Sequence, residues 1–272
     1  FLACTFYAKR EHYFNTFCFF LALSCNTHSI FSIVACSLLA SVFFNQFTEY
    51  KFSLFKKYWK GYLLFFTGLL LAFYQIIPKS DTTFFNEIDY SFYQSLKSVL
   101  SLFKAFFPIV DFTIINYWNQ FYLINNFTIA SIFLGCISFM IPLVLFNKNK
   151  TILFFVYLTF GGFILFEIFT QRYGIRYNGL LFITIIIGFW MMFSEKESPF
   201  LKINISKFNS KIILTLMILQ VFGGIIAYGL GINKTFNHGK NVASFIKNKK
   251  LDVDRIITVS ESASINAFLP EN

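Results

Sequence analysis

The chain has 272 residues, of which 56% are hydrophobic and 13% charged, and its formal net charge is +10. Its mean hydropathy of +0.61 and its many long apolar runs exclude a soluble domain of this length. The sequence therefore predicts an all-α polytopic membrane protein. The five cysteines lack metal-ligand spacing, and we interpret them as small buried hydrophobes rather than disulfide partners or ligands.

The chain begins at Phe1, inside an apolar run, and ends at Asn272 in what reads as an unfinished domain. We therefore expect a fragment that lacks an N-terminal part, and no signal-peptide pattern is visible. Residues 1–8 are predicted to be the tail of an earlier membrane helix, and a basic cap follows at 9–12.

Two short apolar arms, 13–27 and 29–46, meet at Asn26-Thr27-His28. A single helix over both would be about 50 Å long, which exceeds a hydrocarbon core of about 30 Å. A hairpin is therefore predicted. Its first arm is only about 22 Å long, so the turn is expected below the membrane surface, where irregular backbone is tolerated beside a polar cavity. A basic loop at 50–60 precedes the next span, 61–77.

Residues 78–125 are predicted to form a long connection. Apolar residues from Ile88 to Phe107 recur at helical spacing, which is typical of a helix lying in the membrane interface, here over 84–107. Pro108 ends this helix. The carboxylates of the loop fit a metal or acceptor site, although solvated loop residues are the default interpretation. They are Asp81, Glu87, Asp89 and Asp111.

Four further spans are predicted, at 126–147, 151–170, 179–194 and 212–231. Together with the earlier segments they give about seven transmembrane helices. The membrane domain then covers 1–231, and 232–272 reads as the start of a small α/β domain that is cut off before it closes a core.

Basic residues set the expected orientation. Twelve lysines and arginines fall in one set of connections and five in the other, with the tail 232–272 left out because long outer domains escape the rule. The richer set is expected in the cytoplasm. The turn at Asn26–His28, the loop 78–125, the stretch between Glu167 and Gly179 and the tail then share the outer side.

Three ionisable residues lie between two apolar runs: Glu167, Arg172 and Arg176. Charge at the edge of a bilayer is costly unless it binds something or reaches water. Two guanidinium groups spaced four apart around Gly174 suit a phosphate or pyrophosphate. The alternative is that they are interfacial anchors. Glu167 is interpreted first as a structural partner of Arg172 or Gln171 rather than as a catalytic group.

Three other polar residues are candidates for substrate binding. His28 at the hairpin tip suits a sugar hydroxyl, a phosphate or a proton, although a plain polar turn is the simpler interpretation. Trp118 and Asn119 suit stacking on and hydrogen bonding to a sugar ring, although an interfacial aromatic belt is the commoner role.

The order of these features resembles the C-terminal part of bacterial GT-C-type membrane glycosyltransferases. The shared features are a basic cap, a hairpin with a Thr-His tip, a long outer loop with Phe-Pro-Ile and Tyr-Trp-Asn, Arg-Tyr-Asn-Gly opening a helix, and an outer α/β tail. The resemblance implies sugar transfer from a polyprenyl-phosphate donor at the outer face of the bacterial inner membrane. It also implies that Arg172, Arg176 and His28 face the lipid phosphate or the sugar. The family's catalytic carboxylate lies in the first outer loop, upstream of this chain, so the base is not named here.

The implied partners are membrane lipid, a polyprenyl-phosphate-linked sugar and a glycan, lipid or protein acceptor, with no nucleic acid. No cofactor is assigned, and a divalent cation is left open. A transporter or flippase of an anionic lipid-linked precursor is the main alternative. A polysaccharide polymerase or ligase and a non-catalytic membrane subunit are further alternatives. The in-plane helix and the outer tail favour an enzyme that works on one side over a carrier.

Overall fold

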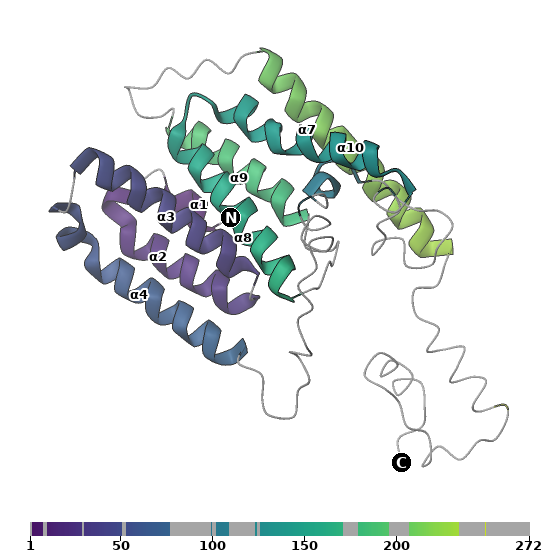
Figure 1. The fold of residues 1–272 in the computed structure, drawn as a ribbon. Helices are drawn as coiled ribbons and strands as arrows, with labels where there is room; N and C mark the ends of the chain where they lie inside the picture. The colour runs from purple at the N-terminus through teal and green to yellow at the C-terminus, as the bar shows by residue number, and fades with distance from the viewer. Residues whose placement is uncertain are drawn as a thin grey trace. The chain divides into compact units, whose positions relative to one another are not determined.

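The computed structural model describes residues 2–7, 10–28, 30–50, 53–76, 99, 102–108, 123, 126–170, 179–195, 207–233 and 248 (Figure 1). Nearly all of these residues are helical, and none of them lies in a strand. The chain divides into one unit of residues 1–109 and 121–220 and a second of 110–120 and 221–272. Of the second unit, only the end of one helix and residue 248 are described. The predicted α/β tail therefore lies almost wholly outside the described residues.

Four helices form the N-terminal part of the first unit. They are α1 (Leu2–Tyr7), α2 (Arg10–Thr27), α3 (Phe31–Tyr50) and α4 (Ser53–Ile76). The break between α2 and α3 confirms the predicted hairpin. The Phe31 amide donates to the His28 carbonyl at 2.9 Å across the turn. The predicted cap at 9–12 is partly helical, because α2 begins at Arg10 and bends at Tyr13, whose φ is −117° and ψ is 31°.

The C-terminal part contains a short 3₁₀ turn and four more helices. They are η1 (Leu102–Ala105), α7 (Thr128–Phe146), α8 (Lys150–Thr170), α9 (Gly179–Glu195) and α10 (Lys207–Asn233). Within the described residues, three helices are long and apolar enough to cross a membrane: Thr128–Phe146, Lys150–Ile168 and Asn209–Gly229. The protein is therefore a helical membrane protein. The number of about seven spans stays a prediction.

Two helices begin earlier than the sequence predicts. The basic stretch 50–60 was expected to be a loop, but α4 starts at Ser53 and carries Lys57 and Lys60, both exposed, on its first turns. Likewise α10 starts at Lys207 instead of 212. A helix satisfies its own backbone groups, and long lysine side chains reach water from it, so basic residues need not end the helix.

The end of the predicted in-plane helix packs into the bundle. Its described part is the η1 turn, in which Leu102, Phe103 and Ala105 are buried, and Phe106 directly after the turn is buried as well. The turn ends at Ala105, three residues before Pro108. The rest of the segment 84–107, apart from Val99, lies outside the described residues.

Helices α2 and α4 pack closely through small residues. A Cβ atom added to Gly68 would lie 2.5 Å from the Ala22 Cβ, so these two backbones approach more closely than a larger residue allows. Nδ2 of Asn26 donates to the Gly68 carbonyl at 2.9 Å. At the other end of the pair the Phe14 ring lies 4.7 Å from the Tyr58 ring.

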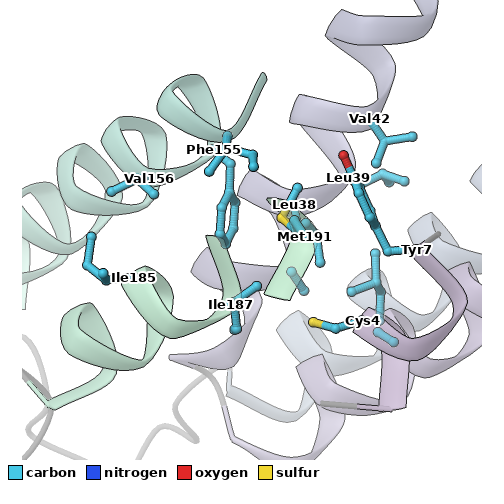
Figure 2. Packing of buried hydrophobic residues seen from close by; sticks show 14 of the residues in the cluster. Cys4, Tyr7, Leu38, Leu39, Val42, Phe155, Val156, Ile185, Ile187 and Met191 are labelled. Atoms are coloured by element: carbon cyan, nitrogen blue, oxygen red, sulfur yellow. The ribbon is translucent and has the colours of Figure 1, made fainter. Parts of the chain in front are cut away.

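Helices α3 and α8 are antiparallel neighbours. The Thr151 hydroxyl donates to Oδ1 of Asn45 at 3.2 Å, so the end of α3 lies beside the beginning of α8. At the opposite end, a Cβ atom on Gly162 would lie 2.6 Å from Cγ2 of Ile33. The buried core joins α1, α3, α8 and α9, and Figure 2 shows Leu38, Phe155 and Ile187 directed toward one another within it.

Candidate functional site

The structure describes two of the six predicted site residues. His28 lies in the α2–α3 turn, and Glu167 lies in the last turns of α8. Arg172, Arg176, Trp118 and Asn119 lie outside the described residues. The candidate site is therefore built from His28, Glu167 and the helices that carry them.

The His28 ring is exposed and is held by its own turn. Its Nδ1 accepts a hydrogen bond from the Ile30 amide at 3.3 Å. In the neutral ring this contact places the proton on Nε2. The ring also meets the Phe31 ring edge-on, with 6.2 Å between centroids. Two local contacts thus orient the imidazole at the end of the hairpin.

Glu167 is buried, with 5% of its surface exposed. It stands on the face of α8 that also carries Val156, Phe160 and Phe163, all buried. Residues spaced three or four apart share one face of a helix, so the carboxylate points the same way as the core residues of α8. A buried carboxylate at this depth needs hydrogen-bonding or charged partners to be stable.

The packing of α3 on α8 brings His28 and Glu167 to the same end of the bundle. Ile33 lies opposite Gly162. Five residues back from Ile33 is His28, and five residues on from Gly162 is Glu167. Because the two helices are antiparallel, the α2–α3 turn, which precedes α3, lies at the same end of the pair as the last turn of α8. Figure 1 shows the α2–α3 turn and the end of α8 on the same side of the helices.

An apolar cavity of about 420 Å³ opens beside this turn. It lies between α1, α2, α3 and α9. Thr27 and Phe31, on either side of the turn, line one part of it, and Leu180 in the first turn of α9 lines another. Deeper in, Cys4, Leu38 and Ile187 line it, and Figure 2 shows these three among the core residues.

The sequence predicted the turn and a polar cavity beside it, but the cavity that the structure shows there is lined mainly by apolar side chains. Leu180, Ile183 and Ile187 recur at helical spacing, which marks one face of α9. Nothing in that spacing says that α1, α2 and α3 supply the other walls. The cavity depends on which helices meet, and an apolar helix carries little information about its neighbours.

No group of three or more histidine, cysteine or acidic side chains comes together within the part of the chain that the structure describes. The four loop carboxylates at 81, 87, 89 and 111 lie outside it. All five cysteines are free. Cys4, Cys18 and Cys25 are buried, as interpreted from the sequence, whereas Cys136 on α7 is exposed.

Comparisons of the chain with protein-family models, with curated proteins and with solved structures find no match. Its function is therefore inferred from its own residues and from the geometry described above.

Proposed function

We propose that the chain is the C-terminal part of a bacterial inner-membrane glycosyltransferase that uses a polyprenyl-phosphate-linked sugar at the outer face. The observation that carries the proposal is the apolar cavity beside the His28 turn, lined also by the first turn of α9. An isoprenoid chain needs an apolar hollow, and its phosphate needs cations at the mouth of that hollow.

The apolar part of the donor fits the cavity. Most of its walls are aliphatic or aromatic side chains, and its polar groups, Ser24 and Thr27, donate within their own helix to the Leu21 and Ser24 carbonyls at 2.7 Å. Both hydroxyl groups therefore already donate their protons to backbone carbonyls and not to a ligand. The walls therefore favour hydrocarbon over a polar ligand.

The cations come from the segment that precedes α9. Arg176 lies three residues before Gly179, and three residues span at most about 11 Å. Arg172 lies two residues after the end of α8 at Thr170. Arg172 is therefore tethered to the end of α8 that carries Glu167, and Arg176 to the start of α9, where Leu180 lines the cavity. A bidentate guanidinium suits a phosphate there.

The proposed reaction is attack of an acceptor nucleophile on the anomeric carbon of the donor sugar. The bond to the lipid phosphate breaks, and a carboxylate takes the acceptor's proton. The resemblance expects that carboxylate in a loop upstream of this chain. Arg172 and Arg176 would stabilise the leaving polyprenyl phosphate, whose charge interacts more strongly in a partly dry site.

Glu167 is not assigned as the base. Its side chain is buried on the face of α8 that carries core residues, whereas His28 is exposed. We propose instead that its carboxylate orients one of the arginines, since a charged pair at this end would keep both groups hydrogen-bonded. It would then act as a positioning residue.

The experiment is a transfer assay with the full-length protein in vesicles, using a panel of polyprenyl-phosphate-linked hexoses and following loss of the donor. Val34→Trp places a large ring in the cavity, which Val34 lines. Ala40→Trp on the same helix is the matched control, because Ala40 is half-buried and does not line the cavity. We expect Val34→Trp to lose transfer and Ala40→Trp to keep it.

A second readout separates the enzyme from a carrier. A fluorescent polyprenyl phosphate is placed in one leaflet, and its appearance in the other leaflet is followed. The proposal expects sugar transfer without accelerated lipid crossing. Accelerated crossing without sugar transfer would replace the glycosyltransferase with the flippase alternative. Equal sugar transfer by the Val34→Trp and Ala40→Trp variants would show that the cavity does not bind the donor.

A further inference from the structure

A second hollow, of about 600 Å³, lies between α7 and α10. We call it the α7–α10 groove. Its walls are mainly apolar and include Phe133, Met140 and Leu219, and Lys211 is its charged member. It uses helices that the first cavity does not touch, and nothing in the proposed sugar transfer requires it.

The two helices run antiparallel along the groove. Nδ2 of Asn209 donates to the Leu145 carbonyl at 3.3 Å, so the beginning of α10 lies beside the end of α7. Val144 and Lys211 therefore mark one end of the groove, and Phe133 and Leu219 mark the other. Phe107, just after η1, also lines the groove, and Nε2 of Gln220 donates to the Ala105 carbonyl at 2.7 Å.

Positive charge gathers at one end of the groove. Lys211 lines it, and Lys148 in the turn after α7 is exposed close to the same helix ends. Lys150, at the start of α8, is exposed as well. The apolar walls thus run from a lysine-rich end to an end beside the η1 turn.

The length of the groove matches one leaflet of a bilayer. From Val144 to Phe133 is eleven residues of α7, and eleven residues of helix rise about 17 Å. Half of a hydrocarbon core is about 15 Å. An acyl chain whose headgroup lies at the lysine end would therefore reach the far end near the bilayer midplane.

We propose that the α7–α10 groove binds an anionic glycerophospholipid, with its phosphate at Lys148 and Lys211 and one acyl chain along the groove. The lipid belongs to the leaflet on the lysine side, which is the cytoplasmic leaflet in the orientation expected from the basic residues. A zwitterionic lipid with the same acyl chains fits the walls equally well, but its headgroup is attracted less strongly to the two lysines.

The test is native mass spectrometry of the purified chain with dioleoyl phosphatidylglycerol or dioleoyl phosphatidylcholine at equal concentration. The wild type is expected to retain phosphatidylglycerol preferentially. The double variant Lys148→Gln with Lys211→Gln should reduce that retention by roughly tenfold, since each basic residue beside an anionic headgroup strengthens the binding of the lipid. Lys57→Gln with Lys60→Gln removes two exposed charges from α4 and is the matched control. It should change nothing.

A second pair of variants tests the walls. Thr215→Trp fills the groove, which Thr215 lines, whereas Ile218→Trp changes an exposed residue of α10 outside it. Thr215→Trp should lose both lipids, and Ile218→Trp should keep them. The proposal would be overturned if the wild type retained the two lipids equally, or if the two pairs of lysine variants lost the same amount of lipid. It would also be overturned if the wild type appeared as a dimer without bound lipid, since a second copy of the chain would then cover the groove.

Discussion

Polar side chains inside the described helices mostly bond within their own helix. The Ser41, Thr159 and Thr184 hydroxyls donate to carbonyls three or four residues earlier, at 2.7 to 2.9 Å. Such bonds satisfy the hydroxyl without linking helices. Bonds between helices are fewer among the described contacts, and those at Asn26 and Tyr62 join α4 to α2 and α3. Each of them therefore contributes to which helices meet.

Tyr62 offers the clearest test of such a bond. Its hydroxyl donates to Oε1 of Gln46 at 2.9 Å, and both residues are buried. Tyr62→Phe should lower the free energy of unfolding by about 0.5–1.5 kcal/mol, because the amide oxygen loses its donor in a dry environment. Unfolding of the detergent-solubilised chain by SDS titration measures this. Tyr74→Phe, at an exposed position of the same helix, is the control and should have no effect.

The sequence predicted the polar candidates but not their surroundings. His28 was predicted at a hairpin tip because Asn26-Thr27-His28 interrupts two apolar arms, and the turn is present. Glu167 was expected near a span end, and it lies three residues before the end of α8. That it lies at the same end of the bundle as the His28 turn follows from the packing of Ile33 on Gly162, which no local pattern encodes.

At the element scale, helix positions follow from hydropathy and helix pairing follows from small residues. The spans predicted at 126–147, 151–170 and 179–194 agree with α7, α8 and α9 to within two residues at each end. Apolar length and turn residues decide such limits. Helix α8 is apolar around most of its circumference, so the face that meets α3 was not readable from its sequence.

The two adjacent glycines of α8 make this pairing testable. A Cβ atom on Gly162 would lie 2.6 Å from Cγ2 of Ile33, a branched side chain with little freedom, whereas one on Gly161 would meet nothing within 4 Å. Gly162→Ala should therefore lower the free energy of unfolding by about 1–3 kcal/mol through overpacking.

Gly161→Ala is the control for this substitution. It should be neutral or stabilise the helix by up to about 1 kcal/mol, because alanine has the higher helix propensity. SDS titration of both variants gives the comparison. A similar response of the two variants would mean that α3 and α8 do not pack at Gly162.

At the scale of the whole molecule, orientation decides which face each site serves. The excess of basic residues in one set of connections predicts that Ser80 and Ser210 lie on opposite sides of the membrane. Each is changed to cysteine after Cys136→Ser removes the exposed native thiol. A maleimide that does not cross membranes should label Ser80→Cys from outside intact cells and Ser210→Cys only after lysis. Labelling of both cysteines from the same side would contradict the proposed orientation.

The proposed sugar transfer requires that the end of the bundle near His28 holds an anionic lipid headgroup above the apolar cavity. The most direct measurement is the affinity of the purified chain for a polyprenyl phosphate, compared between wild type, Arg176→Ala, Arg176→Lys and Lys60→Ala. We expect binding to weaken about tenfold or more for Arg176→Ala, and less for Arg176→Lys, because a guanidinium holds phosphate through two charge-assisted bonds. Lys60→Ala, which removes a distant exposed charge on α4, should bind as the wild type does. Wild-type affinity in Arg176→Ala would contradict a phosphate site at Arg176.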